Sequence, residues 1–558
     1  MKWLLIRRHG FATIPLSLKT LVPLLLLMGE PTERAQAQCG LFQRGDANAD
    51  GSMDISDPVS ILGFLFREFP RELPCEDAAD ANDDGVIDMS DAVAALGFLF
   101  LGTLSPSEPF HECGLDPSED DLDCCSFAPC KKQWSELQEA HVAFLQGDSS
   151  WGLPTFATSL AVDGSGNLYV TGKAFGGCPI SFPCFIYYLT IKYDAAGEEI
   201  WRALIQLPVF PPVADWSVST ASLALDRQGN PHILEEYLTG DGEPFNRDYL
   251  TVKYSTEGEE IWRAVYDSPG GGQDRPGAMA IDVEGNVYVT GYSEGDLAMV
   301  KYSPQGKELW VTRVSGPEIQ IRPQTLALDG AGNATIATAS AGDLLTIKYD
   351  PEGHELWSAR FHEEAVTAHA SALAVDDARN VLVAGHQSPT GVGPSSCILI
   401  KYSPEGGQIW STRYEAPDSR GNSLTAIALD GSGDIVVTGR ASGRRSSEFS
   451  TLKFDAGGEL LWSACFATAT DLGCSSGGAQ ALSLDGSGNV YVVGGSGGDL
   501  TTIVYSRDGN EIALGRHPGR MYTVSIAVDS AGNIHVAASG EDGDAYLVIK
   551  YHRVDDLK

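Results

Sequence analysis

One short phrase is repeated eight times between residue 163 and the end of the 558-residue chain, and this repetition constrains the fold more than any other feature. Each copy is an Asp, two variable residues, then Gly-Asn or a close variant, as in "DGSGNLYVTG" at 163 and "DGSGNVYVVG" at 485. The spacing runs from 44 residues (Asp485 to Asp529) to 63 residues (Asp163 to Asp226). Such a period is typical of sheet repeats arranged around an axis, and not of helical solenoids.

A second phrase, KY-x-x-x-G-x-x-x-W, alternates with the first, for example "KYSPQGKELW" from Lys301. Alternating apolar residues flank both phrases, and such runs around an Asp, Gly or Asn turn predict β-hairpins. Two hairpins per unit make one four-stranded blade. We therefore predict a mainly β fold in which residues 132–558 form a closed β-propeller. Eight blades are expected, and seven remain the alternative if a divergent terminal unit does not insert.

The second phrase ends in tryptophan in six copies, eight residues after the tyrosine or, in the sixth copy, after Phe454, whereas the seventh copy has Ala513. The rings could form a cofactor platform, but one ring per blade on the outermost strand favours packing between neighbouring blades. These residues are Trp201, Trp262, Trp310, Trp357, Trp410 and Trp462.

The eighth copy stops after Tyr551 without an outer strand, while "KKQW" ending at Trp134 stands alone before the first unit. We therefore expect the N-terminal segment around Trp134 to supply the missing strand of the last blade and close the ring, which removes exposed edges. A helix over "SELQEAHVAFLQ" is the competing local interpretation.

The units resemble bacterial β-propeller repeats, the kind named for a seven-bladed propeller, over about 150–551. They also look like the blades of quinoprotein dehydrogenases, which implies a quinone and calcium enzyme as an alternative function. Those enzymes need a carboxylate site inside the ring, and we find no acidic cluster tied to a blade end; the vicinal Cys124–Cys125 precede the ring. A carbohydrate-active propeller is the other enzymatic alternative. The sequence favours a binding protein with no catalytic or cofactor-binding residues.

Two acidic loops, "DANADGSMDISD" and "DANDDGVIDMSD", precede the repeats and begin 34 residues apart, at Asp46 and Asp80. Oxygen-bearing side chains at positions 1, 3, 5, 9 and 12 and glycine at position 6 are what a calcium loop requires. Each loop runs into a similar apolar helix, "PVSILGFLF" or "AVAALGFLF". We therefore predict two calcium ions. The candidate ligands are Asp46, Asn48, Asp50, Ser52, Asp54 and Asp57, then Asp80, Asn82, Asp84, Val86, Asp88 and Asp91, with Ser52 and Val86 contributing backbone carbonyls.

This pair of loops resembles a dockerin module, the duplicated calcium loop and helix that attaches secreted proteins to cohesin-bearing partners. The resemblance covers residues 38–103 and implies a small, α-helical, EF-hand-like module. Loop positions 10 and 11 are Ile55–Ser56 and Met89–Ser90, where dockerins often carry a Ser/Thr pair that touches cohesin. A calcium-clamped spacer that meets no cohesin is the alternative role.

The first 37 residues are typical of an export signal, with a basic start, the apolar run "LVPLLLLM" and the small-residue motif "AQA". No later stretch could span a membrane, so an exported, monomeric protein at the cell surface, outside the cell or in the periplasm is expected. A net charge of −37 argues against nucleic acid as a partner. Residues 104–131, rich in Cys, Pro and acidic residues, are interpreted as a linker.

The eleven cysteines suit disulfides outside the cytoplasm, with Cys178–Cys184 and Cys465–Cys474 as the short-range candidates and Cys397 as the candidate unpaired residue.

Any ligand of the propeller is expected on the face that carries the loops of variable length, because the repeated turns of the other face are uniform. Exposed aromatic residues there could stack on a glycan or hold an extracellular protein. The candidates are Phe175, Tyr187, Trp216 and Phe245.

Overall fold

The protein is described by a computed structural model that covers two folded parts of the chain. The residues described are 42–50, 52–67, 69–70, 73, 75–102, 105–110, 122, 135–137, 139–145 and 155–552, the last range without 177–183, 210–221, 240–245, 316–324, 392, 417–420, 443–446, 467–468, 471–472, 475–476, 497, 520 and 541–545. The predicted export signal and most of the predicted linker therefore lie outside the described residues.

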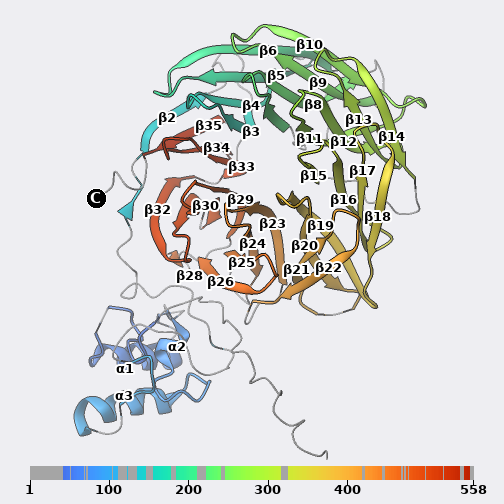
Figure 1. Ribbon diagram of the computed structural model, residues 1–558. Coiled ribbons are helices and arrows are strands. Elements are labelled where there is room, and N and C mark those ends of the chain that lie inside the picture. Colours follow the sequence, from blue (N-terminus) through green and yellow to red (C-terminus); the bar gives the residue numbers. More distant parts are fainter. Residues whose placement is uncertain are drawn as a thin grey trace, which may run out of the picture. The chain divides into compact units, whose positions relative to one another are not determined.

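The N-terminal part is helical, as predicted, and contains α1 (Ser56–Arg67), α2 (Glu76–Ala79) and α3 (Met89–Leu101) (Figure 1). Its core gathers buried apolar side chains from both halves of the duplication. Ile61 of α1 and Ala92 of α3 pack with Leu73 and Ala79. No helix within the described ranges is long and apolar enough to cross a membrane.

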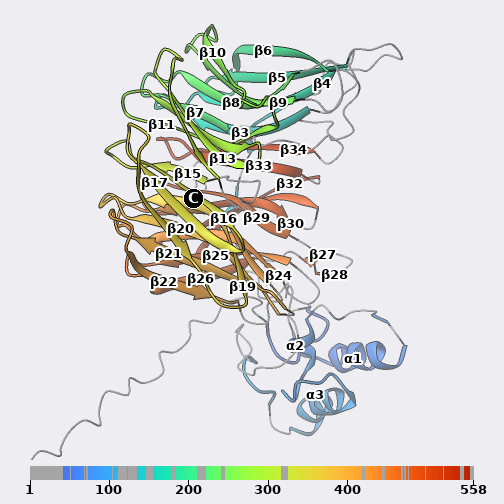
Figure 2. The same ribbon diagram turned by 90° about the vertical axis from the view of Figure 1, so that its right-hand side faces the viewer.

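The C-terminal part is a β-propeller of eight four-stranded antiparallel blades, which confirms the predicted fold and settles the number of blades (Figures 1 and 2). Blades 1 to 4 consist of β3 (Thr155–Val162), β4 (Leu168–Gly176), β5 (Cys184–Tyr193) and β6 (Glu199–Val209); β7 (Ser222–Leu225), β8 (Pro231–Thr239), β9 (Asn246–Tyr254) and β10 (Glu260–Tyr266); β11 (Asp274–Ile281), β12 (Val287–Ser293), β13 (Asp296–Tyr302) and β14 (Glu308–Val314); and β15 (Thr325–Leu328), β16 (Ala334–Ser340), β17 (Asp343–Tyr349) and β18 (Glu355–Phe361).

Blades 5 to 8 follow the same order from the inner to the outer strand. They consist of β19 (Val366–Val375), β20 (Val381–Pro389), β21 (Ser396–Tyr402) and β22 (Gln408–Tyr414); β23 (Gly421–Leu429), β24 (Ile435–Ser442), β25 (Ser447–Phe454) and β26 (Leu460–Phe466); β29 (Gly477–Leu484), β30 (Val490–Ser496), β31 (Asp499–Tyr505) and β32 (Glu511–Pro518); and β33 (Met521–Val528), β34 (Ile534–Gly540), β35 (Tyr546–Tyr551) and β2 (Glu139–Leu145). A small hairpin of β27 (Ala469–Thr470) and β28 (Gly473–Cys474) lies between blades 6 and 7.

The ring is closed by the N-terminal strand β2, which pairs antiparallel with β35 as the outer strand of blade 8. The competing interpretation of this segment as a helix is therefore wrong. The predicted position also needs correction, because the residue opposite Lys550, where other blades place tryptophan, is His141. Trp134 itself lies outside the described residues. The hydrophobic cluster of Ala157 and Leu160 with Ala537 and Val548 joins blade 1 to blade 8.

The six repeated tryptophans pack between blades, as predicted, and each reaches the following blade. Each indole Nε1 donates a hydrogen bond of 2.8–3.3 Å to a backbone carbonyl in the next blade's KY-x-x-x-G turn, for example Trp310 to Pro351. The ring lies against the glycine of that turn, where a Cβ on Gly353 would stand 2.8 Å from Trp310. The link therefore requires both the ring and the glycine.

Blade 7 has Ala513 in the tryptophan position. The short strand β1 (Ser135–Glu136) instead pairs parallel with β32, opposite Ala513 and Leu514. It brings Leu137 into the hydrophobic cluster shared by blades 7 and 8, where Leu137 is 5% exposed. The N-terminal segment therefore fills the boundary of blades 7 and 8, which lacks a tryptophan.

A buried lysine and aspartate hold the two hairpins of a blade together. In Asp329, Oδ1 accepts hydrogen bonds from the backbone of Ala331 and Asn333, and Oδ2 lies 2.9 Å from Lys348 Nζ. Burial opposes ionisation of Asp329, but the hydrogen bonds from Lys348 and Asn333 outweigh it and lower the pKa of the carboxyl group. The D-x-x-G-N phrase is therefore an Asx turn whose aspartate also forms an ion pair with a buried lysine of the same blade. The same ion pair occurs in the blades of Lys253, Lys301, Lys401 and Lys453.

Two glycine substitutions test the contact between tryptophan and turn. A Cβ on Gly406 (φ +88°) would stand 2.6 Å from Trp357, whereas a Cβ on Gly433 (φ +81°) would have nothing within 4 Å. Gly433→Ala should cost only the left-handed backbone strain, about 1–2 kcal/mol. Gly406→Ala should cost roughly 1–3 kcal/mol more, because the indole must move. Thermal unfolding should therefore rank Gly406→Ala below Gly433→Ala, and equal melting temperatures would contradict the role of the ring.

Candidate functional site

The two acidic loops have the same backbone conformation, so the structure repeats the sequence duplication. Both loops turn through a left-handed residue at position 4, Ala49 (φ 56°) and Asp83 (φ 61°). Gly85 at position 6 of the second loop is also left-handed (φ 77°), which glycine adopts without strain. The equivalent Gly51 lies outside the described residues. Residues of the following helices also match, since Asp57, Pro58 and Ile61 are buried in α1 and Asp91, Ala92 and Ala95 in α3.

The carboxylates at positions 1 and 12 lie at the centre of each loop and are fully buried. In the second loop, Asp80 accepts hydrogen bonds from the backbone of Asp84 and Gly85, and Asp91 accepts them from Asn82 and Asp88. The first loop repeats this pattern around Asp46 and Asp57. At position 9, Asp54 and Asp88 each accept a hydrogen bond from the backbone two residues on.

The position-12 carboxylates are destabilised in their charged form. Burial raises the pKa of Asp57 to about 6, and the charges of Asp46 and Asp50 contribute to the increase. Burial likewise raises the pKa of Asp91 to about 7, with a hydrogen bond and a charge from Asp80 adding to it. In their charged form the carboxylates of each loop repel one another, which a divalent cation would relieve, although no three carboxylates of either loop approach within 4.8 Å in the described part of the chain.

The remaining predicted ligands lie on the same loops but are more exposed, and some bond to each other. Asn48 Nδ2 donates to Asp50 at 3.1 Å, and the Asp50 carboxylate accepts from the Ser52 hydroxyl at 3.0 Å. Asp84 accepts from the backbone of Val86. The oxygen set fits calcium in type and in loop position; its simultaneous coordination of an ion remains a prediction.

Arg44, a residue that sequence reasoning did not single out, fastens the start of the second loop. Its side chain is fully buried, donates to the backbone carbonyl of Asp80 at 2.9 Å, and forms a 3.0 Å ion pair with Asp83. A lone arginine two residues before the first loop gives no periodic signal, so its role could be found only from the fold.

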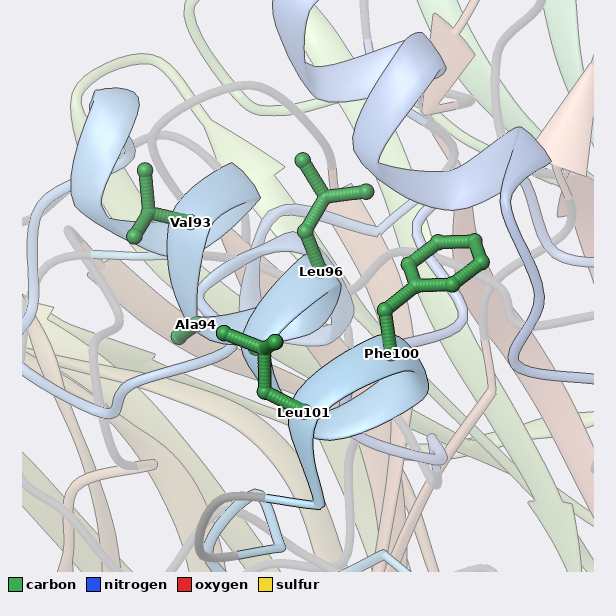
Figure 3. Close-up of a pocket in the computed structure, with 6 residues that line it drawn as sticks. Val93, Ala94, Leu96, Phe100 and Leu101 are labelled. Carbon is green, nitrogen blue, oxygen red and sulfur yellow. The ribbon is translucent and has the colours of Figure 1, made fainter.

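A stripe of exposed apolar side chains begins at position 10 of each loop and continues along the helix that follows. Ile55, Val59 and Phe66 are 56%, 61% and 67% exposed, and their counterparts 34 residues later, Met89, Val93 and Phe100, are 58%, 61% and 64% exposed. Separations of four and eleven residues place each set on one side of its helix. The α3 stripe opens onto an apolar surface that includes Leu96 and Leu101, and Figure 3 shows these side chains projecting from successive turns. Soluble proteins rarely expose contiguous apolar patches unless these bind something.

The variable connections of the propeller lie mainly outside the described residues. Of the aromatic candidates on them, Trp216 and Phe245 fall on such segments, and the side chain of Phe175 is not described. Tyr187 is 6% exposed and therefore packs inside the blade, which corrects its assignment as a residue that could stack on a ligand.

The structure describes the states of Cys75, Cys397 and Cys465, whereas Cys474, the partner predicted for Cys465, lies outside the described side chains. Cys75 and Cys465 are in disulfides. Cys397 is free and buried, as predicted for the unpaired residue, and burial raises the pKa of its thiol to about 12. The predicted Cys178–Cys184 pair falls outside the described side chains.

Comparisons with known proteins bear on the propeller. No curated protein matches the chain. One similar solved structure is a protein of unknown function from Bacteroides caccae, with 16% sequence identity and a TM-score of 0.29; the match covers 51% of this chain and 98% of that one. Another is a protein from Lactobacillus plantarum, with 14% identity and a TM-score of 0.36; the match covers 56% of this chain and 94% of that one. PorZ, a surface component of the type-IX secretion system of Porphyromonas gingivalis, is also similar, with 12% sequence identity and a TM-score of 0.38. This match covers 70% of this chain and 61% of PorZ.

One family model matches a continuous region of the propeller. The model described as outer membrane protein assembly factor BamB matches residues 247–437 and 302–527, and the two matches together span half of the chain. They begin in blade 2 and end in blade 8, so the match follows the repeated blades. The chain therefore belongs to the β-propeller family that this model describes.

Proposed function

We propose that the protein is an exported, non-enzymatic scaffold that attaches to a cohesin-like protein through its calcium-loop module and presents its propeller to an extracellular protein or glycan. The duplicated apolar stripe carries this proposal. Both copies begin within a calcium-type loop, so ion binding would fix the start of the helix along which each stripe continues.

The chemistry of the stripe favours a protein partner over a sugar. A glycan would need polar groups that pair with its hydroxyls, whereas Ile55, Val59 and Phe66 offer only apolar contact. Protein interfaces have apolar centres of this kind, rich in aromatic residues and methionine. The apolar residue at loop position 10 therefore predicts a cohesin-like partner whose matching surface is also apolar.

The proposal is tested by measuring binding of the full-length mature protein to a panel of purified cohesins in calcium and in EDTA. Because the stripe occurs twice, a single substitution leaves one copy intact, so the test variant is Val59→Glu with Val93→Glu. Calcium-dependent binding that falls at least tenfold in this variant is expected. Leu356→Glu, at a 50% exposed apolar position on β18, is the matched control and should bind normally.

Two results would contradict this function. Absence of binding to every cohesin in calcium would favour the spacer role of the module. Reduction of a redox dye by the protein supplied with pyrroloquinoline quinone, calcium and alcohols would instead support a quinoprotein enzyme.

A further inference from the structure

Three carboxylates meet at the boundary of blades 2 and 3, far along the chain from the calcium-type loops. Asp248 lies near the start of β9, Asp267 follows β10, and Asp274 begins β11. One carboxylate oxygen of each lies within 4.8 Å of those of the other two. Across the described part of the chain, these three are the one group of potential metal-binding side chains that approach so closely.

Two buried polar atoms at this boundary lack hydrogen bonds. Asp274 is fully buried; its Oδ2 accepts a 2.7 Å hydrogen bond from the backbone of Ser268, but its Oδ1 has no partner among the described atoms. Ser293 lies directly opposite Asp274 on β12, is also fully buried, and its hydroxyl has no partner there either. Opposite residues of an antiparallel pair place their side chains on the same face of the sheet. Burying such groups unsatisfied is costly, so their occurrence together indicates a ligand between them.

In blades 3 and 4, an arginine lies beside the aspartate that is equivalent to Asp248. The aspartate five residues before the buried lysine is Asp248 in blade 2, Asp296 in blade 3 and Asp343 in blade 4. Arg313, three residues after the tryptophan of blade 3, lies 3.2 Å from Asp296. Arg360, in the same position of blade 4, lies 3.6 Å from Asp343.

Blade 2 departs from this arrangement. The arginine position is occupied by Val265, which is opposite Leu250 just as Arg360 is opposite Leu345. Asp267 and Asp274 bring further negative charge to the place that an arginine occupies elsewhere. The adjacent Arg247 donates to both carboxylate oxygens of Glu236.

We propose that Asp248, Asp267 and Asp274 bind a hard divalent cation, with calcium the best match, in place of the arginine of blades 3 and 4. All three offer oxygen, the ligand that calcium prefers, and the Ser293 hydroxyl supplies a fourth. Asn246, whose amide bonds to Asp248 at 3.1 Å and to Asp267 at 3.5 Å, can turn its oxygen toward the ion. Asp267 is exposed, so the ion enters from solvent. The ion would fasten the outer strand of blade 2 to the inner strand of blade 3.

The test counts calcium ions bound by the full-length mature protein, by equilibrium dialysis at pH 7.5 after removal of metal. The sharpest variant is Val265→Arg, which installs the cation of blades 3 and 4 on a 44% exposed side chain and should fold. It should bind one ion fewer than the wild type. Asp267→Asn, at an exposed position, should weaken the same site by roughly tenfold or more. Asp343→Asn, the equivalent aspartate of blade 4, should bind the same number as the wild type.

The outcome is independent of the calcium-type loops, because it is read as a difference between variants that share them. If Val265→Arg and Asp267→Asn bind as many ions as the wild type with unchanged affinity, the proposal is overturned. A loss of one ion in Asp343→Asn as well would also overturn it, because the effect would then not be specific to blade 2.

Discussion

Removal of calcium should loosen residues 46–101 while the propeller stays folded. Each ion held at a thousand times its dissociation constant would stabilise the helical module by about 4 kcal/mol. Without ions, the buried carboxylates of each loop face one another, and the small core around Ile61 must hold the fold alone. Hydrogen exchange of the full-length protein should show faster exchange of both loops and of α1 and α3 in EDTA, reversed by calcium. Unchanged protection in EDTA would contradict calcium binding by the loops.

The substitution Asp91→Asn should stabilise the helical module in EDTA and destabilise it in calcium. The pKa of Asp91 rises from 3.8 to about 7 in the folded, ion-free loop, so this group favours the fold below about pH 4 and loses that contribution as the pH rises through 7. At pH 8 in EDTA, the neutral amide should therefore make the module more stable than the wild type. In calcium at the same pH, loss of a ligand should make it less stable.

Asp83→Asn is the matched control for this reversal. It lies in the same loop at position 4, where the side chain pairs with Arg44. It should weaken the module slightly in both conditions. A destabilisation of Asp91→Asn that is equal with and without calcium would indicate a purely structural role.

Deletion of the closing strand should prevent the propeller from remaining monomeric. A chain that begins at residue 146 lacks β1 and β2, so β35 becomes an unpaired edge and Leu137 leaves the boundary of blades 7 and 8. An apolar open edge invites pairing with other chains. The truncated protein should be aggregated or oligomeric in size-exclusion chromatography with light scattering. A chain that begins at residue 132 keeps both strands and should be monomeric.

This second truncation also separates closure from a general effect of shortening the chain. If the chain from residue 146 were monomeric and melted at the same temperature as the chain from 132, β2 would be dispensable. Addition of a peptide spanning residues 132–145 should restore the monomer if the strand acts through pairing alone.

Much of this architecture could be predicted because each blade repeats its own chemistry. The aspartate of each D-x-x-G-N turn and the tryptophan of each outer strand act within one blade or between consecutive blades, so their spacing reveals their contacts. The closing strand β2 was harder to predict from the sequence, because its residues also suit a helix. Its pairing partner, β35, lies about 400 residues away in the chain.

The acidic group of blade 2 was missed for a different reason. Asp248, Asp267 and Asp274 come from three different strands or loops and form no sequence motif. They indicate a metal site only because the fold brings their carboxylates together. A signal was nevertheless present in the repeats. Aligning the blades on their tryptophans shows Val265 where Arg313 and Arg360 stand, while Asp248 is kept where those blades have Asp296 and Asp343. A pair that keeps only its acidic member indicates a local change of function.

The way in which β1 and β2 span two blades also has a mechanical consequence. A protein tethered through its N-terminal module would transmit tension into the propeller through Ser135 and Glu136, which pair with β32, before the load reaches the pairing of β2 with β35. Neighbouring blades therefore share the pull, and the parallel bonds of β1 must yield before the closing strand can be stripped from the ring. For a molecule anchored in flowing liquid, that order of loading would protect the pairing of β2 with β35 that closes the ring.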